Sequence, residues 1–315
     1  MRALLVCNPK ATTTSDRVRD VLVRALRSET KLDVAYTRRR WHAAGLARSA
    51  RASGMDLVVV LGGDGTVNEV INGLLADSPE RNVPAVAVVP GGSTNVFARA
   101  LGLPVDWAEG TAVILEALRD GRMRHIGLGR ADDRYFTFCA GFGMDADVIH
   151  RVERARLRGR KSTPWLYMQS MAGNFVFEKS ARDRRIAIER PGEEAIDEIS
   201  TVIIQNTAPW TFIGERRIDA TPHASFDLGL DVMAMRHMTL AATTRTMAQL
   251  LIGRWDDEAN TPTGPHGKQV VHCHDLSEFT VSATSPVGLQ VDGEFLGVRD
   301  KVRFTSAPAA IRVVC

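Results

Sequence analysis

The sequence predicts an N-terminal parallel α/β domain followed by a second, mostly antiparallel domain. In the first part of the chain, short apolar runs alternate with stretches of helical periodicity, which is typical of a parallel sheet. Two of these runs, Leu57–Leu61 and Pro84–Val89, lead directly into Gly-rich loops and then into helices. From Met123 onward, short alternating runs are separated by turn residues such as Pro191-Gly192, which indicates antiparallel strands.

Capping and helix-breaking residues set the limits of the elements in the first domain. Ser15 is placed to cap a helix, and Asn8-Pro9 ends the first strand because proline lacks an N–H donor. Gly102 and Pro104 stop a short helix in the same way. The expected strands are Ala3–Cys7, Leu32–Tyr36, Leu57–Leu61 and Pro84–Val89, and the expected helices follow Ser15 and Gly65 and cover Ala43–Ala52, Val96–Leu101 and Trp107–Asp120.

The second domain is expected to hold many short strands and two helical inserts. A final strand over Ile311–Val314 is expected to return to the first domain, so the predicted division is 1–122 with 306–315, and 123–305. The inserts are expected at Trp165–Phe177 and Leu240–Ile252, and the strands at Tyr135–Cys139, Arg185–Glu189, Thr201–Gln205, Asp231–Met235, Phe279–Ser282, Leu289–Val291 and Val302–Thr305.

The composition argues against a nucleic-acid-binding protein, a disulfide-rich protein and a membrane-spanning protein. A net charge of +3 and a pI near 8.8 are too mild to indicate nucleic-acid binding. The four cysteines are scattered without a C-x-x-C pair, so neither a disulfide framework nor a zinc ribbon is expected and a cytoplasmic setting fits. No apolar run reaches the roughly 18 residues of a membrane span, so we expect membrane contact only as a peripheral protein on the inner membrane face.

The stretch from Leu57 to Val70 predicts a strand, a tight loop and a helix. Glycines let backbone approach a ligand closely, and the N-terminus of the following helix offers N–H groups to an anion, so the loop suits a phosphate. Asp64 would repel a phosphate directly, but it fits if a divalent cation lies between the carboxylate and the phosphate oxygens. The alternative is a tight turn in which Asp64 only caps the chain.

A second Gly-rich loop, Pro90–Asn95, follows the next strand. Ligands of open parallel sheets gather outside the carboxyl ends of the strands. Both loops and Asn8 are therefore expected to converge on one crevice.

These residues, taken with motifs farther along the chain, resemble the diacylglycerol kinase catalytic-domain family, which includes soluble bacterial lipid kinases and sphingosine kinases. The resemblance runs in order over nearly the whole chain and is more specific than the Gly-Gly-Asp-Gly loop, which NAD kinases and phosphofructokinases share. The motifs that carry it are Asn8-Pro9, Gly62-Gly63-Asp64-Gly65-Thr66, Asn68-Glu69, Pro90–Asn95 with Phe97-Ala98-Arg99, Ala140–Ala146 and Asp292-Gly293-Glu294.

The resemblance implies an NAD kinase-like α/β domain and a C-terminal β-sandwich, with ATP, Mg²⁺ and a lipid substrate meeting between them. It implies that Glu294 is the proton acceptor, with Asp64 and Asp292 as further catalytic residues and as cation ligands. The implied nucleotide-binding residues are Asn8, Pro9, Lys10, Ala11, Thr12, Thr37, Gly62, Gly63, Asp64, Gly65, Thr66, Val67, Asn68, Glu69, Gly91, Gly92, Ser93 and Thr94.

The chemistry of phosphoryl transfer agrees with these roles, since it needs a metal-neutralised nucleotide and a carboxylate that takes the proton of the acceptor hydroxyl. Asp292 and Glu294 are two residues apart, so on a strand both side chains would project from one face. One would serve the cation and the other the hydroxyl. The alternative is a polar hairpin turn that contains Asp292-Gly293.

The chain departs from the family at acidic positions. Val96, Gly127 and Leu228 stand where the family commonly has aspartates, although Asp227 lies next to the last of them, and Thr12 replaces a glycine of the first loop. A structural metal site is therefore not expected.

Two further clusters have both functional and structural interpretations. The basic run Arg151, Arg154, Arg156, Arg158, Arg160 and Lys161 beside an apolar segment suits an anionic membrane surface, but it also fits a solvated loop. His272, Cys273, His274 and Asp275 resemble a metal cluster, but neighbouring strand positions rarely converge on one ion.

The sequence therefore favours an ATP-dependent lipid kinase acting on a diacylglycerol-like or long-chain-base alcohol. The second hypothesis is a kinase that phosphorylates a soluble acceptor such as NAD. A nucleotide-binding regulator that has lost catalysis is the third, because of Val96 and Gly127.

Overall fold

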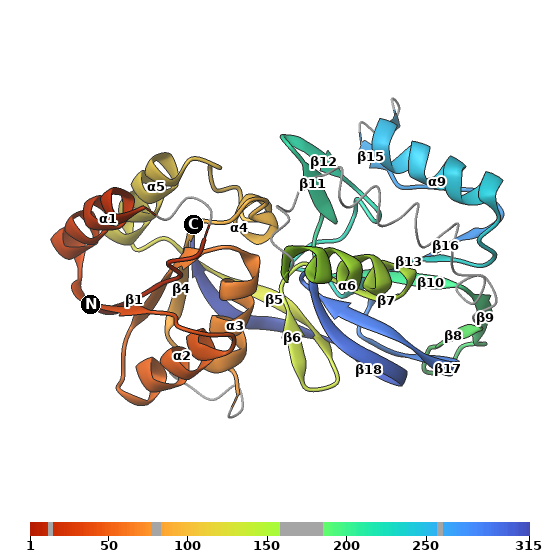
Figure 1. Cartoon of the computed structure of the whole chain (residues 1–315), viewed down its shortest axis with the longest axis horizontal. Helices are drawn as coiled ribbons and strands as arrows, with labels where there is room; N and C mark the ends of the chain where they lie inside the picture. Colours follow the sequence, from red (N-terminus) through yellow and green to blue (C-terminus); the bar gives the residue numbers. More distant parts are fainter. Residues whose placement is uncertain (12–14, 77–82, 158–184, 257–260) are drawn as a thin grey trace. The chain divides into compact units, whose positions relative to one another are not determined.

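A computed structural model describes the chain except for residues 12–14, 77–82, 158–184 and 257–260. The described chain divides into two compact units, the first Met1–Leu128 with Pro308–Cys315 and the second Gly129–Ala307. Strand β5 (Met123–Ala131) runs through the division between them, a few residues beyond the predicted boundary at residue 122. The predicted fold class, an α/β domain followed by antiparallel strands, is confirmed (Figure 1).

The sheet of the first unit is parallel, in the order β18-β4-β3-β1-β2. Its central strands are continuous runs of buried aliphatic residues, as expected for strands covered on both faces. The last part of β18 enters beside β4, where Val313 pairs with Val86. The strands are β1 (Arg2–Cys7), β2 (Lys31–Tyr36), β3 (Leu57–Gly62), β4 (Ala85–Pro90) and β18 (Glu294–Val314).

Helices cover both faces of this parallel sheet (Figure 1). On one face α1 (Asp16–Glu29) and α5 (Trp107–Asp120) pack Leu22, Leu26 and Ile114 against the strands. On the other face α2 (His42–Ala52) packs against α3 (Asp64–Leu74). The expected cap is confirmed, because Ser15 Oγ accepts a hydrogen bond from the Val18 N–H at 3.2 Å.

The second unit is built around one bent strand, β17 (Glu278–Val291). Its last residues pair with β7 (Cys139–Gly143), which continues through β10 (Thr201–Gln205) and β13 (Leu230–Met235) to β16 (Val270–Leu276). Its first residues pair instead with β8 (Ile186–Glu189), and β18 pairs with both ends of β17. The register shift between Ser282 and Val287 marks the bend.

The two groups of strands that β17 joins share one buried core. Helix α6 (Met144–Leu157) packs against β7, β10 and β17. The large core residues are Phe136, Phe142, Phe279 and Phe304, drawn from both groups. The remaining elements of the unit are β6 (Arg134–Phe136), β9 (Ile196–Ile199), β11 (Thr211–Ile213), β12 (Arg216–Ile218), α9 (Leu240–Ile252), β14 (Arg254–Asp256) and β15 (Thr261–Thr263).

Several sequence expectations for this unit were wrong in detail. The single strand predicted over Tyr135–Cys139 is two strands, β6 and β7, because Thr137 and Phe138 turn to donate hydrogen bonds to Asp292. The strands predicted at Phe279–Ser282 and Leu289–Val291 are the two ends of β17. Helix α6 was not predicted, and the helix expected over Trp165–Phe177 lies outside the described residues.

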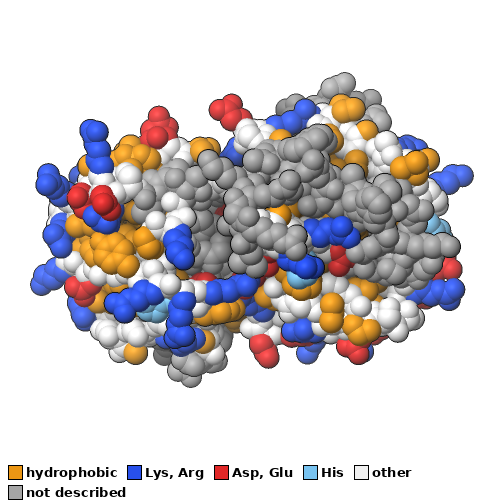
Figure 2. All heavy atoms as spheres, in the orientation of Figure 1, with side chains coloured by type: hydrophobic (Ala, Val, Ile, Leu, Met, Phe, Trp, Pro, Cys, Tyr) orange, Lys and Arg blue, Asp and Glu red, His pale blue; other side chains and the backbone are white. Residues whose placement is uncertain are grey.

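Among the described residues drawn in Figure 2, many basic side chains have acidic or apolar side chains beside them. Within the described part of the chain, no helix is long and apolar enough to cross a bilayer.

Candidate active site

The carboxyl ends of β1, β3 and β4 lie next to one another in the first unit, and Asn8 joins two of the loops that follow them. The Asn8 backbone N–H donates to the Leu61 carbonyl at 2.9 Å, and Asn8 Nδ2 donates to Thr66 Oγ1 at 3.0 Å. Asn8 Oδ1 in turn accepts from the Lys10 N–H at 3.0 Å, which shapes the first loop. These bonds confirm that Asn8 and the first Gly-rich loop converge.

The two Gly-rich loops touch through their backbones. A Cβ placed on Gly91 would lie 2.9 Å from the Gly62 nitrogen, and one on Gly92 would lie 2.7 Å from the Gly63 Cα. Side chains at these positions would force the loops apart. Gly91 and Gly92 are therefore required by packing within the protein, whatever the ligand.

Gly65 differs from these glycines, because it is exposed and a Cβ there would meet no protein atom within 4 Å. It lies in the first turn of α3, whose N-cap residue Gly63 has no side chain to cap the helix. Glycine weakens a helix, and an uncapped N-terminus is a site for anions. A bound phosphate that approaches the backbone would explain why a glycine stands here.

Gly65→Ala should keep or raise the melting temperature, since alanine favours the helix by about 1 kcal/mol. ATP affinity measured by calorimetry should fall about tenfold, equivalent to about 1.4 kcal/mol, because the methyl group fills the space we assign to a phosphate. Gly91→Ala is the comparison, and it should lower the melting temperature because its Cβ meets backbone. Unchanged ATP affinity in Gly65→Ala would contradict the assignment of a phosphate to this position.

Asp64 ties the two loops together. Its Oδ2 accepts from the Val96 N–H and its Oδ1 from the Phe97 N–H, both at 3.0 Å. These are the first N–H groups of α4 (Val96–Ala100), so the carboxylate caps that short helix. The capping alternative for Asp64 is thus what the structure describes, although the residue capped lies on the second loop.

A cation role for Asp64 stays a prediction. The described residues hold no group of three or more His, Cys, Asp or Glu side chains that suits a metal ion. Mg²⁺ commonly uses one or two protein carboxylates, with phosphate oxygens and water completing its shell, and a carboxylate has about four lone-pair positions. A nucleotide-bound Mg²⁺ at this position would therefore not require a cluster of protein carboxylates.

Several residues predicted to bind the nucleotide have structural partners. Glu69 Oε2 accepts from the Ala43 N–H at 3.1 Å, near the start of α2. Asn68 is buried and its Oδ1 accepts from Asn72 Nδ2 at 3.0 Å, and the Val67 side chain is also buried. Any contact of these three with a nucleotide stays a prediction, and for Val67 it would be through the backbone.

The remaining predicted residues of this group lie on the loops at the same edge of the sheet. Thr37 follows β2, and its N–H donates to the Cys7 carbonyl at 2.9 Å. Lys10 and Ser93 are exposed, whereas Ala11 and Thr94 are half-buried. Pro9 lies in the first loop, and Thr12 lies outside the described residues.

Two residues near these loops were not assigned from the sequence. Asn95 has a positive φ of 50° and fixes the second loop, because its Oδ1 accepts from the Gly92 N–H at 2.8 Å and its Nδ2 donates to the Gly92 carbonyl at 2.9 Å. The Gly-Gly-Ser-Thr-Asn spacing was a usable signal for this turn. Cys7 ends β1, and burial raises the pKa of its thiol to about 11, so it is no nucleophile.

In the second unit, Asp292 lies in a hairpin turn between β17 and β18. Val291 pairs with Glu294, and Asp292 and Gly293 have positive φ values of 47° and 77°, as in a type I′ turn. The expectation that Asp292 and Glu294 share one face of a strand was wrong, because the chain reverses between them. The hairpin alternative is the one that the structure describes.

The Asp292 carboxylate is buried and accepts hydrogen bonds from the segment Thr137–Cys139. Its Oδ2 accepts from the Thr137 N–H at 2.7 Å and from Thr137 Oγ1 at 2.8 Å. Its Oδ1 accepts from the N–H groups of Phe138 at 3.0 Å and Cys139 at 3.2 Å. These bonds fasten the turn to the segment between β6 and β7, and the cation role of Asp292 stays a prediction.

Asp292→Asn should destabilise the protein by about 1–3 kcal/mol, because the new amide group places a donor against backbone donors in a buried site. Urea unfolding would measure the loss. Asp300→Asn, an exposed acid on β18, is the matched control and should change stability by less than about 0.5 kcal/mol. Unchanged stability together with a raised Mg²⁺ requirement would favour the cation role instead.

Glu294 begins β18, directly after this turn, and it forms an ion pair. Arg134 Nη2 on β6 donates to Glu294 Oε2 at 2.7 Å, and the two side chains are only 11% and 14% exposed. Such a partly buried, charge-assisted bond fixes the carboxylate more firmly than a surface pair would. Arg134 was missed, since nothing in the sequence distinguishes it from the other arginines.

The other clusters do not form a reactive centre among the described residues. His274 Nδ1 bonds to Asp231 Oδ1 at 2.8 Å, and His272 Nε2 bonds to the Pro265 carbonyl at 2.6 Å, so the two histidines point to different partners. Of the basic run, the side chains of Arg151 and Arg154 are described, and those from Arg156 to Lys161 lie outside the described residues. The anionic-membrane interpretation stays a prediction.

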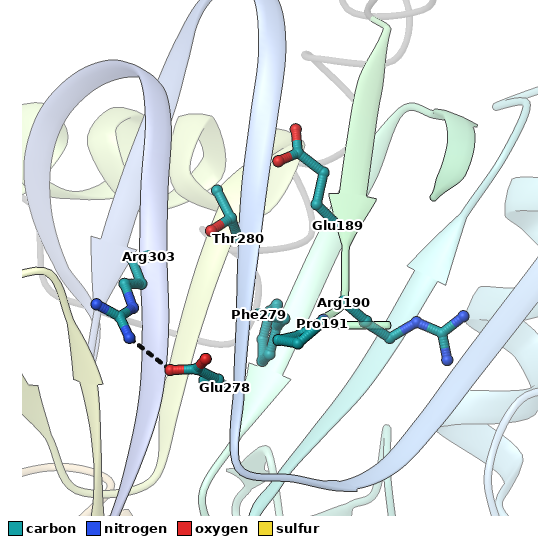
Figure 3. A pocket seen from close by; sticks show the side chains of 7 residues that line it. All are labelled: Glu189, Arg190, Pro191, Glu278, Phe279, Thr280 and Arg303. Carbon is teal, nitrogen blue, oxygen red and sulfur yellow. Dashed lines mark hydrogen bonds and ion pairs between the residues drawn. The ribbon is translucent and has the colours of Figure 1, made fainter. Parts of the chain in front are cut away.

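A shallow pocket of about 250 Å³ lies in the second unit, at the start of β17 and thus at the opposite end of that strand from the Glu294 turn (Figure 3). Arg303 Nη2 and Glu278 Oε2 form an ion pair of 2.5 Å on its wall. Its lining residues are Glu189, Arg190, Pro191, Glu278, Phe279, Thr280 and Arg303, none of them predicted as site residues. A lining so rich in charge does not suit an acyl chain.

Comparisons with known proteins match much of this chain to diacylglycerol kinases. Residues 2–131 match the profile of the family described as the diacylglycerol kinase catalytic domain. The chain is 28% identical over 253 residues to a diacylglycerol kinase of Bacillus subtilis strain 168, a match that covers 80% of this chain and 75% of that protein. It is 33% identical over 133 residues to a diacylglycerol kinase of Staphylococcus saprophyticus, covering 42% of this chain and 41% of the relative.

Among solved structures, the chain resembles the crystal structure of a diacylglycerol kinase from Bacillus anthracis Sterne. The TM-score is 0.70 at 18% sequence identity, and the match covers 99% of this chain and 96% of that one. At this identity the likeness shows the fold alone.

Proposed function

We propose that the protein is an ATP-dependent lipid kinase, because residues 2–131 match the family described as the diacylglycerol kinase catalytic domain. It would transfer the γ-phosphate of ATP to the hydroxyl of a diacylglycerol-like or long-chain-base lipid. The observation that carries the proposal is the pair of Gly-rich loops at neighbouring strand ends, held in contact by Gly91, Gly92 and Asp64.

In this proposal the first unit binds the nucleotide. The phosphates lie against the exposed backbone at Gly65 and the N-terminus of α3, where glycine and the positive end of the helix dipole favour an anion. Asn8 and Thr66 support these loops through their mutual hydrogen bond. Mg²⁺, when bound through Asp64 and the phosphates, would neutralise charge on the transferring group.

Glu294 is proposed as the group that takes the proton of the lipid hydroxyl. Its carboxylate is held on a short hairpin whose base is fastened by Asp292, and Arg134 fixes one of its oxygens. A pre-positioned carboxylate acts as a general base without reorganising at the moment of transfer.

One observation favours a regulator without catalysis as the second candidate. The non-acidic residues Val96 and Gly127 leave Asp64 as the acidic side chain on the described Gly-rich loops, so the cation would have few protein ligands. Such a regulator would bind ATP without transferring phosphate to any acceptor.

The test is incubation of the purified protein with [γ-³²P]ATP and Mg²⁺ together with a total lipid extract, and separately with NAD. We expect label in an organic-soluble phospholipid, identified by mass spectrometry, and none in NAD. Glu294→Gln serves as the matched control and should leave the lipid nearly unlabelled. Labelled NAD would show that the acceptor is soluble and not a lipid. ATP binding without any phosphoryl transfer would favour the regulator.

A further inference from the structure

A buried acid on α6 connects to the turn that carries Glu294. Asp145 lies in the first turn of the helix, and its Oδ2 accepts from Gln290 Nε2 at 2.7 Å. The other end of the same amide, Gln290 Oε1, accepts from the Gly293 N–H at 2.9 Å. Gly293 precedes Glu294, so three residues form a continuous chain of hydrogen bonds from α6 to the hairpin, here named the turn network.

The position of Asp145 requires a specific neighbour. A Cβ on Gly141 of β7 would lie 1.7 Å from Asp145 Oδ2, so the carboxylate rests directly against the strand backbone where only glycine leaves room. Gln290 is also buried, with 1% of its surface exposed. A buried amide has one favourable orientation when an acceptor lies at one end and a donor at the other.

We infer that Asp145 and Gln290 are positioning residues for Glu294, acting through the Gly293 N–H. This rests on the proposed function, because it assumes that Glu294 is the base. The ionised Asp145 accepts only, so it holds Gln290 Nε2 toward itself and leaves Oε1 for Gly293. A protonated Asp145 would instead donate its O–H, compete with Gly293 for the amide oxygen and loosen the turn.

The pKa of the Asp145 carboxyl sets the pH range in which the turn network changes. Burial raises the pKa of the Asp145 carboxyl to about 6, the Gln290 hydrogen bond opposes the rise, and the charge of Asp147 adds to it. Asp145 is therefore ionised at pH 8 and largely protonated at pH 5. The other titratable or charged groups described on the elements around it are His150, Arg151, Glu153 and Arg154 on α6, Cys139 on β7, Arg134 on β6, Glu278 on β17 and Asp292 and Glu294 at the turn.

The network predicts three different kinetic results. Asp145→Asn carries a donor at every pH, like the protonated acid, so kcat at pH 8 should fall toward the parent's value at low pH and the loss of activity near pH 6 should disappear. Asp147→Asn should move that loss to lower pH, since a repelling charge is gone. Gln290→Leu should lower kcat by about 10–100-fold at every pH with the KM for ATP unchanged, since misplacing a catalytic group by about 1 Å can cost 10²-fold.

A measurement independent of activity separates this inference from the proposed function. In ¹⁵N-labelled full-length protein, the Gly293 backbone amide resonance should shift with a midpoint near pH 6, and this shift should be absent in Asp145→Asn. If it is seen while no lipid is phosphorylated, the network stands and the proposed reaction fails.

If the parent phosphorylates lipid but Asp145→Asn keeps the same loss near pH 6, or if folded Gln290→Leu keeps kcat within threefold, the inference is overturned. The inference is also overturned if the Gly293 amide resonance of the parent does not shift between pH 8 and pH 5. Should Gln290→Leu fail to fold, the Asp145→Asn and Asp147→Asn profiles and the Gly293 resonance still decide.

Discussion

Glu294→Gln should lower kcat for lipid phosphorylation by about 10²–10⁴-fold, the usual contribution of general-base catalysis. Glutamine keeps the size of the side chain and an oxygen that accepts from Arg134, so the turn and the fold should persist. ATP affinity should change little, because the proton is transferred only as the phosphoryl group moves. The measurement is steady-state kinetics on the lipid identified by the extract screen, with ATP binding measured by calorimetry.

Glu278→Gln is the control for the Glu294 experiment. Glu278 lies at the other end of β17 and also pairs with an arginine, Arg303, but it has no place in the proposed reaction, so kcat should remain near the parent value. The base assignment fails if Glu294→Gln retains kcat within a few-fold while Asp64→Asn is inactive. The proton acceptor would then have to be sought on the loop from Gly62 to Thr66.

Asp64→Asn should reduce turnover by about 10²-fold or more and should also lower the melting temperature. Asparagine has one acceptor oxygen, so only one of the Val96 and Phe97 N–H groups keeps its partner and the start of α4 loosens. A displaced second loop misaligns the bound nucleotide, for which a shift of about 1 Å can cost 10²-fold. Removing the negative charge also weakens Mg²⁺ binding, if the cation lies there.

Titration with Mg²⁺ distinguishes the two roles of Asp64. If the residue acts through the cation, high Mg²⁺ should restore part of the lost activity, whereas damage to the loop should persist at every Mg²⁺ concentration. Asp33→Asn, an exposed acid on β2, is the control and should behave as the parent. Near-parent turnover of Asp64→Asn at every Mg²⁺ concentration would show that neither role matters for catalysis.

The strands and helices of the first unit followed from sequence because their signals are local. Continuous aliphatic runs such as Leu57–Leu61, the Ser15 cap and the breaker residues Gly102 and Pro104 act over a few residues, and the structure places the elements within about a turn of the prediction. The alternation of strand and helix then left few topologies other than a parallel sheet. The order of the motifs indicated the family whose profile residues 2–131 match.

The partners of the site residues were decided by the tertiary structure. The sequence marks Asp64, Asp292 and Glu294 as acids beside glycines, but the N–H groups of Val96 and Phe97, the Thr137 segment and Arg134 come from positions far along the chain. Likewise, Asp145 lies 145 residues before Gln290, and only the pairing of β7 with β17 brings them together. Hydrogen bonds between distant residues leave no local pattern, so the sequence motifs indicate candidate site residues but not the contacts that hold them.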